Sequence, residues 1–375
     1  MNKLIFKESD LDLYFEQPTK SLANFIKAKM IGLEIFRYET SEPVIYLCNK
    51  TNQYDRAVVE CSLSGDYVFL KDDVVSKINA QQITDQEKDK LLGMFKTLKK
   101  NNISVVIFPE TNYSIFGDIE PLTLQITDFM FETEFNFKYL FIIGSYFAYP
   151  IWSKNIRRTK VKVVQNKGYS HNYLCDTNNI ERNRLINSKM PSSAGIYAMN
   201  YRTLIRSNRC AEGFESVVYA CPHCSSLLSL YSEFNCLKCK VCDKALEIAN
   251  NGQINLSRNI ETYDDLPEIL FDILNSIKFE TKSIATYQNL EMIKEENEKT
   301  VITKNIQLEI YSDQIILTND ECENSISLAS IKNSTLMHKN TIKIETEKES
   351  FLLKGHGKEN FYIIIDLIKL NKNTY

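Results

Sequence analysis

Residues 105–114 read VVIFPETNYS, and this stretch decides the fold of the N-terminal half of the chain. The run Val105–Phe108 is continuously apolar, which is typical of a short buried strand. A helix is predicted just upstream, because Thr84 and Glu87 form a capping box and apolar side chains follow at helical spacing up to Leu98. A strand, a helix and a strand of these lengths predict a βαβ unit and a mixed, largely parallel sheet.

Further apolar runs predict the other strands of this α/β domain, which we expect over residues 1–205. They lie at 44–48, 67–70 and 139–144, beside the strand predicted at 103–108. In sheets of this kind, functional residues gather just past the carboxyl ends of the strands. Two such segments are NKTNQYD at 49–55 and PETNYS at 109–114. These two segments are therefore the candidate site.

Together the two segments resemble the paired signatures of the glycerolipid acyltransferase family, which includes the 1-acylglycerol-3-phosphate acyltransferases. The family writes these signatures as N-H-x-x-x-x-D and F-P-E-G-T-R-S. Asn49 and Asp55 match the first signature. The residues that match the second are Phe108, Pro109, Glu110 and Ser114. Residues 143–152, which read IGSYFAYPIW, resemble a segment found in one bacterial branch of the family.

The resemblance implies a reaction and a role for each position. An acyl group would pass from acyl-CoA or an acyl carrier protein to the hydroxyl of a lysophospholipid-like acceptor. In the family the histidine is the base, the aspartate orients it, and the second signature binds the acceptor's phosphate. Catalysis would thus fall to Asp55, to Glu110 and to Lys50, which stands at the histidine position. The substrate-binding positions would be Asn49, Thr111, Asn112, Tyr113 and Ser114.

Two replacements in these signatures divide the functional prediction. Lys50 replaces the histidine, and a protonated lysine cannot accept the proton of an attacking hydroxyl unless burial lowers its pKa by several units. Residues 111–113 read TNY where the family has Gly-Thr-Arg, which removes the arginine that would clamp a phosphate. One interpretation is an acyltransferase of phospholipid metabolism. The other is a catalytically silent acyltransferase-like protein that binds lipid or a protein partner.

The cysteines predict a metal site. Five of the ten fall between residues 221 and 242, and in a cytosolic chain such clustering favours metal binding over disulfides. Two C-x-x-C pairs can enclose one tetrahedral zinc ion, and a closed site of this kind is structural. Cys236 with Cys239 is an alternative second pair, and a module with surplus thiols and no metal is the other alternative. We assign as ligands Cys221, Cys224, Cys239 and Cys242.

The patterning changes after the cysteine module. We expect a zinc ribbon over 206–257, as in the resembled bacterial branch, and a helical linker over 258–300, in which 294–299 is a charged, solvated stretch. From Ile302 onward apolar and polar residues alternate, which predicts a β-rich domain over 301–375 that ends in one helix. Antiparallel strands followed by a C-terminal helix resemble a pleckstrin-homology-like barrel.

Composition narrows the classes of function. The net charge of −3 gives no general argument for nucleic-acid binding. The N-terminus lacks the apolar region of a signal peptide, and no apolar run reaches the roughly 18 residues that would suggest a membrane span. We therefore expect a cytoplasmic protein that can lie at the cytoplasmic membrane face without crossing it.

Residues 20–31 are the segment that suggests membrane contact. They predict an amphipathic helix with Leu22, Phe25 and Ile26 on one face and the lysines Lys20, Lys27 and Lys29 nearby. Apolar area with basic flanks suits the surface of an anionic bilayer. The alternative is a helix that packs this face on its own domain.

Overall fold

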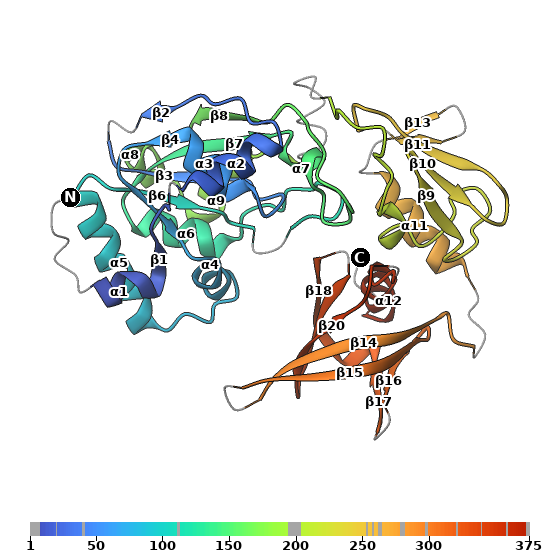
Figure 1. The fold of residues 1–375 in the computed structure, drawn as a ribbon. Coiled ribbons are helices and arrows are strands. Elements are labelled where there is room, and N and C mark those ends of the chain that lie inside the picture. The colour runs from blue at the N-terminus through green and yellow to red at the C-terminus, as the bar shows by residue number, and fades with distance from the viewer. Residues whose placement is uncertain are drawn as a thin grey trace. The chain divides into compact units, whose positions relative to one another are not determined.

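The computed structural model describes residues 8–19, 21–39, 42–110, 113–193, 204–252, 254–256, 259–261, 265–277, 282–296, 299–319, 322–338, 340–357 and 359–372. The chain forms two compact units (Figure 1). The first consists of residues 1–148 and 157–205, and the second of residues 149–156 and 206–375.

The first unit is built on a six-stranded sheet with the strand order β1-β5-β6-β3-β7-β8. The four middle strands are parallel, and each arises from one predicted apolar run. They are β3 (Val44–Cys48), β5 (Tyr67–Leu70), β6 (Ser104–Ile107) and β7 (Asn136–Ile143). The antiparallel edge strands are β1 (Phe15–Glu16) and β8 (Lys162–Lys167). The sheet is therefore mixed, as predicted. A separate parallel pair is formed by β2 (Tyr38–Glu39) and β4 (Leu63–Ser64).

Helices cover both faces of this sheet (Figure 1). On one face the strands share a single apolar core with α4 (Asp72–Asn79), α5 (Asp85–Lys100), α6 (Leu124–Glu132) and α9 (Asn179–Asn187). On the other face α3 (Asp55–Ser62) places Arg56 over the ring of Phe69, and α2 (Leu22–Met30) packs on α3. The short helices are α1 (Glu8–Tyr14), α7 (Ser145–Ala148) and α8 (His171–Cys175).

Helix α5 begins where the sequence predicts it. The hydroxyl of Thr84 accepts the N–H of Glu87 at 3.2 Å, and the carboxylate of Glu87 accepts the N–H of Thr84 at 3.0 Å. This pair of bonds is the predicted capping box, and it satisfies N–H groups that have no partner within the helix. The side chains of Leu91, Phe95 and Leu98 then lie fully buried in the core.

The second unit contains two antiparallel sheets. The first has the order β13-β12-β11-β10-β9 and follows the short helix η1 (Phe214–Ser216). The connection between the third and fourth strands in chain order, 245–248 and 254–256, contains Gly252, whose φ of +86° favours glycine. Its strands are β9 (Leu230–Glu233), β10 (Cys236–Cys239), β11 (Ala245–Ile248), β12 (Ile254–Leu256) and β13 (Asn259–Glu261).

The second sheet of this unit has seven strands in the order β17-β16-β15-β14-β20-β19-β18. Helix α11 (Asp265–Ser276) precedes it, and α12 (Tyr362–Lys372) follows it and packs on η2 (Leu328–Ser330) and on β18. A β-rich C-terminal region is therefore present, as predicted. The strands are β14 (Ala285–Glu296), β15 (Lys299–Ile310), β16 (Gln314–Thr318), β17 (Glu323–Ser327), β18 (Ile331–His338), β19 (Thr341–Thr346) and β20 (Ser350–Lys354).

One expectation about this region is wrong. The segment 258–300 is not a helical linker, because β13, α11 and the whole of β14 lie within it. The charged residues at 294–296 end β14, and Lys299 begins β15. The sequence pattern did not predict β14, because Asn289 has a φ of +61° and the pairing register of β14 with β15 shifts on both sides of Leu290. Such a bulge breaks the alternation of period two from which strands are predicted.

The segment 143–152, which resembles one bacterial branch of the family, is divided between the two units. Residues 149–156 belong to the second unit, in which Trp152 is fully buried with its ring 4.5 Å from that of Phe214. Gly213 lies against this segment with a φ of +94°, and a Cβ added there would stand 2.1 Å from the carbonyl oxygen of Trp152. Only glycine fits such an approach. Residues 1–205, expected as one domain, therefore do not form one compact unit, because 149–156 belong to the second.

Candidate functional site at the strand ends

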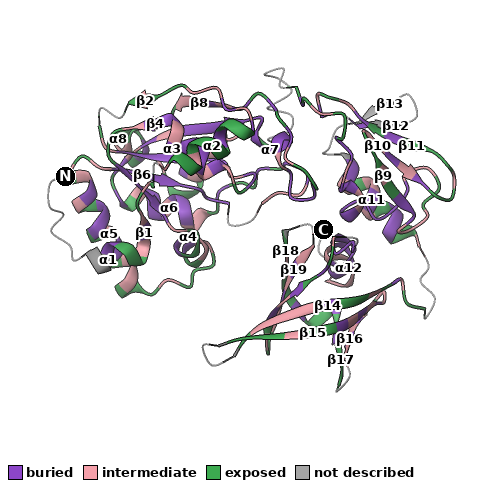
Figure 2. Cartoon of the chain, in the orientation of Figure 1, coloured by how far each residue is buried: buried purple, intermediate pink, exposed green. Residues whose placement is uncertain are grey.

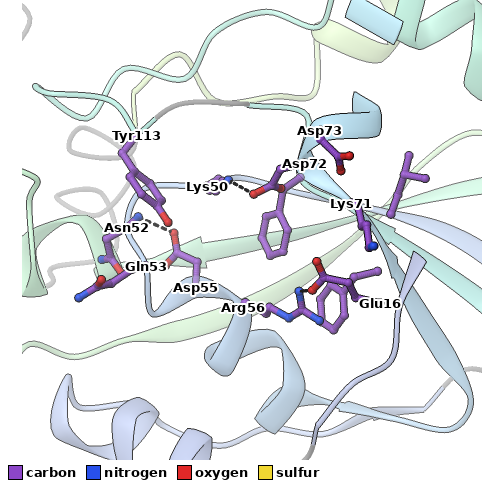
Figure 3. A pocket seen from close by; sticks show the side chains of 13 residues that line it. Glu16, Lys50, Asn52, Gln53, Asp55, Arg56, Lys71, Asp72, Asp73 and Tyr113 are labelled. Atoms are coloured by element: carbon purple, nitrogen blue, oxygen red, sulfur yellow. Dashed lines mark hydrogen bonds and ion pairs between the residues drawn. The ribbon is translucent and has the colours of Figure 1, made fainter. Parts of the chain in front are cut away.

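The carboxyl ends of the four parallel strands each deliver a polar residue to one edge of the sheet. Lys50 follows β3, Asp72 follows β5, Glu110 follows β6 and Ser145 follows β7. A pocket of about 240 Å³ lies at this edge, and Lys50, Asp72 and Asp55 are among the residues that line it (Figure 3). The edge is the one at which the sequence predicts a site.

Lys50 is held by an acid and by an aromatic ring. Its Nζ donates to Oδ2 of Asp72 at 2.6 Å and lies 5.2 Å from the centre of the Tyr113 ring (Figure 3). The side chain of Lys50 is 11% exposed and that of Asp72 is 55% exposed. Both are contacts that a cation makes, and an ammonium group has no lone pair with which to accept a proton.

Asp55 is engaged by its own loop and by Ser145. Its Oδ2 accepts hydrogen bonds from the N–H of Thr51, from the hydroxyl of Thr51 at 2.9 Å and from the N–H of Asn52 at 2.9 Å. Its Oδ1 accepts a hydrogen bond from the hydroxyl of Ser145. Burial raises the pKa of Asp55, and these bonds oppose the rise. Among the described residues, none of its hydrogen bonds involves Lys50. The carboxylate therefore stabilises the turn that begins α3, and it does not orient the side chain at position 50.

Asn49 joins two strands. Its Nδ2 donates to the carbonyl oxygen of Ile142 at 3.1 Å, and its Oδ1 accepts the N–H of Ile142 at 2.7 Å. The residue is buried and does not line the pocket. Asn49 thus extends the pairing of β3 and β7 past the end of β3, which is a structural role.

Glu110 is a buried acid beside the pocket. Its Oε2 accepts the N–H of Lys50 at 3.1 Å, and for Oε1 no hydrogen bond is found within the described parts of the chain. Burial raises the pKa of Glu110 to about 8, and the nearby Asp55 adds to this rise, whereas the N–H of Lys50 opposes it. At pH 7 Glu110 is therefore mostly protonated.

This raised pKa gives a prediction about stability. The acid binds its proton more tightly in the folded chain than in the unfolded chain, so stability should fall as pH rises from about 4.5 toward 8. Glu110→Gln keeps an acceptor for the N–H of Lys50 and removes the titration. Between pH 6 and pH 9 we expect the melting temperature of the wild type to fall by at least about 5 °C more than that of Glu110→Gln. Parallel curves in a thermal scan would contradict the assignment.

The remaining predicted residues fall in three places. Tyr113 lines the pocket, and burial raises the pKa of its hydroxyl to about 12. Ser114 accepts the N–H of Gly117 at 2.8 Å and so stabilises a turn. Thr111 and Asn112 lie outside the described residues.

Sequence reasoning missed two residues of this site. Asp72 forms the ion pair with Lys50. The hydroxyl of Ser145 donates to Asp55 and accepts a hydrogen bond from Nδ2 of Asn52 at 2.9 Å. The signal was available in the sequence, because each residue comes within two positions of the end of a predicted strand. The strand-end rule applies to all four parallel strands and not only to the two that carry the resembled signatures.

A second candidate site lies in the cysteine module. The Sγ atoms of Cys221, Cys224, Cys239 and Cys242 all lie within 4.8 Å of one another and could hold a metal ion. The Cys221–Cys242 and Cys224–Cys239 separations are both 3.7 Å. Four thiolates placed about 2.3 Å from a tetrahedral zinc ion are about 3.8 Å apart, so the cluster fits such an ion.

The structure also decides between the alternative cysteine pairs. Cys236 lies at the start of β10, where it pairs with Glu233 and Glu247, and it is not part of the cluster. Cys239 ends the same strand and accepts the N–H of Val241 at 3.4 Å. Burial would raise the pKa of Cys239, but hydrogen bonds from Ser229 and Ser226 lower it, whereas burial raises the pKa of Cys221.

Comparisons with known proteins do not assign this chain to a family. No model of a known protein family matches it, and no curated protein matches it. Among solved structures it is similar to the N-terminal PH domain of the human ARAP2 protein, at 14% identity and a TM-score of 0.22, over 26% of this chain and 90% of that one. It is also similar to the C-terminal domain of an unknown protein from Leishmania infantum, at 15% identity and a TM-score of 0.15, over 20% of this chain and 70% of that one.

Proposed function

We propose that the first unit contains a catalytically silent acyltransferase-like domain that binds a lipid and does not acylate it. The ion pair of Lys50 with Asp72 carries this proposal. It places an ammonium group where acyl transfer needs a base, and general-base catalysis contributes about 10²–10⁴-fold to such reactions. The hydrogen bonds that Asp55 makes to its own loop and to Ser145 support the same conclusion, since they leave no oriented base.

The lining of the pocket favours a zwitterionic head group over a phosphate alone. Arg56, one of its cations, is paired with both Glu16 and Glu60 and is therefore engaged. A phosphate alone would meet more carboxyl groups than cations, whereas a head group with both charges can match both. The acidic lining residues are Glu16, Asp55, Asp72 and Asp73, the basic ones are Lys50, Arg56 and Lys71, and the apolar and aromatic ones are Phe69, Leu70, Phe108 and Tyr113.

This proposal predicts selective binding of a lysolipid. By calorimetry, a short-chain lysophosphatidylethanolamine below its micelle concentration should bind, and the matching lysophosphatidic acid should bind at least about tenfold more weakly. Lys71→Gln combined with Asp73→Asn should weaken the first ligand severalfold, because both charges line the pocket. Lys138→Gln, on β7 and away from the pocket, is the control. No heat of binding, or binding that the double variant leaves unchanged, would contradict the proposal.

A second candidate function is acyl transfer from acyl-CoA or an acyl carrier protein. The observation in its favour is Glu110, whose pKa of about 8 suits a general base near neutral pH. In that case the acceptor hydroxyl would have to reach a buried carboxyl group that does not line the pocket. Activity that Glu110→Gln abolishes would favour this second function.

For the second unit we propose a structural zinc ion and a pleckstrin-homology-like C-terminal domain. The sulfur separations support zinc, and four cysteine ligands leave no open coordination position for a substrate. The seven antiparallel strands followed by α12 support the second assignment. The helix contacts both η2 and β18, and β18 is an edge strand of the sheet.

A further inference from the structure

Helix α2 presents apolar side chains to solvent. Leu22 is 73% exposed, Phe25 43%, Ile26 50% and Met30 51%, whereas Ala28 is buried where the helix packs on α3. Most of the helix accordingly has the colour of exposed residues in Figure 2. We call these four side chains the α2 face. The alternative in which this face packs on its own domain is wrong, because the small side chain of Ala28 makes the packing contact.

Cations border the α2 face. Nζ of Lys29 lies 5.9 Å from the centre of the Phe25 ring, and Arg37 lines a pocket together with Phe25. Arg158 lies at the C-terminal end of the helix, since its Cγ would be 3.5 Å from a Cβ added at Gly32. Lys29, Arg37 and Arg158 belong to three separate segments of the fold, so the basic border does not arise from one run of sequence.

The acids near this border are Glu34, Glu39 and Glu60, of which Glu60 lines the same pocket as Phe25 and Arg37. Glu60 is paired with Arg56. Glu34 is paired with Lys160 at 3.1 Å and with Lys162 at 3.6 Å, and these lysines lower its pKa although burial alone would raise it. The surroundings of the α2 face therefore carry net positive charge on a chain whose net charge is −3. In a symmetric dimer this positive face would meet the same face of its partner, and the like charges would repel. The face has the right sign for anionic lipid.

We propose that the α2 face docks on the surface of an anionic lipid bilayer. Its apolar side chains would enter the boundary between head groups and acyl chains, and Lys27, Lys29, Arg37 and Arg158 would lie at the level of the phosphates. Among the described residues no helix is long and apolar enough to cross a bilayer. The proposal goes beyond lysolipid binding in the pocket, because none of the four side chains of the α2 face lines that pocket.

The test uses the full chain and vesicles of two compositions. The wild type should sediment with vesicles of phosphatidylcholine that contain about one third phosphatidylglycerol, and much less with phosphatidylcholine alone. Phe25→Glu, and independently Ile26→Glu, should lower the apparent affinity at least about tenfold, since both place a charge in the apolar layer. Lys27→Gln with Lys29→Gln should weaken binding and reduce its dependence on salt.

The control is Ile180→Glu, which changes an apolar side chain of α9 that is 71% exposed. It should leave vesicle binding unchanged, and circular dichroism should show all variants folded. The proposal is overturned if the wild type does not bind anionic vesicles, or if Ile180→Glu and Phe25→Glu reduce binding equally. It is also overturned if the wild type is a dimer that Phe25→Glu dissociates. Lysolipid binding in the pocket should survive Phe25→Glu, so the two proposals can fail separately.

Discussion

The substitutions Cys221→Ser and Cys239→Ser should each release the metal from the chain and unfold residues 206–256. Binding of a structural zinc ion supplies about 10–16 kcal/mol in small metal modules, far more than a five-stranded sheet of short strands contributes by itself. The two cysteines come from opposite sides of the cluster and have no sulfur partner in common among the close pairs. Elemental analysis should therefore give about one zinc per wild-type chain and well below one in each variant.

Cys236→Ser is the matched control. It removes a thiol from the same strand as Cys239 but outside the cluster, so metal content and amide protection of β9 to β11 should stay at wild-type values. Wild-type protein without metal, purified in the absence of chelators, would refute the assignment. So would loss of metal in Cys236→Ser alone.

The second large effect concerns the missing base. Lys50→His alone should restore little acyl transfer to lysophosphatidic acid, because Asp55 remains bonded to its loop and to Ser145 and the phosphate clamp is still absent. Adding Thr111→Gly, Asn112→Thr and Tyr113→Arg should raise the rate by a further factor of about 10 or more. The base and the phosphate clamp act on one transition state, so the effects of their substitutions on the rate need not be additive. Radiolabelled acyl-CoA measures the rate directly.

The control for this gain keeps the three loop substitutions and places glutamine at position 50. It removes the Lys50–Asp72 ion pair as histidine does, but it offers no base. Transfer should appear with histidine and not with glutamine. Equal rates in the two proteins would mean that the loop, and not residue 50, limits the chemistry.

Patterning predicts the frame of this fold well. The four parallel strands are short apolar runs, and helix α5 carries both its capping box and its apolar stripe in the sequence. The strand β14 could not be predicted in this way. Its bulge at Asn289 shifts the alternation of side chains, and the strand ends in charged residues, which are atypical of a strand.

The candidate site shows a similar division. Sequence order predicts which residues meet, because the ends of parallel strands meet at one edge of the sheet. It does not predict their partners. Asn49 bonds to β7, Asp55 to its own loop and Lys50 to Asp72, and each of these choices depends on side-chain directions that only the packed structure defines.

The most direct test of the account is acyl transfer by the unmodified protein. Purified chain would be incubated with radiolabelled acyl-CoA, or with acyl carrier protein, and with several lysophospholipid acceptors. If the Lys50–Asp72 pair has replaced the catalytic base, product should not exceed that formed by the heat-denatured protein. Robust turnover that both Asp55→Asn and Glu110→Gln abolish, in variants shown to be folded, would contradict the silent site and identify these carboxyl groups as part of a working one.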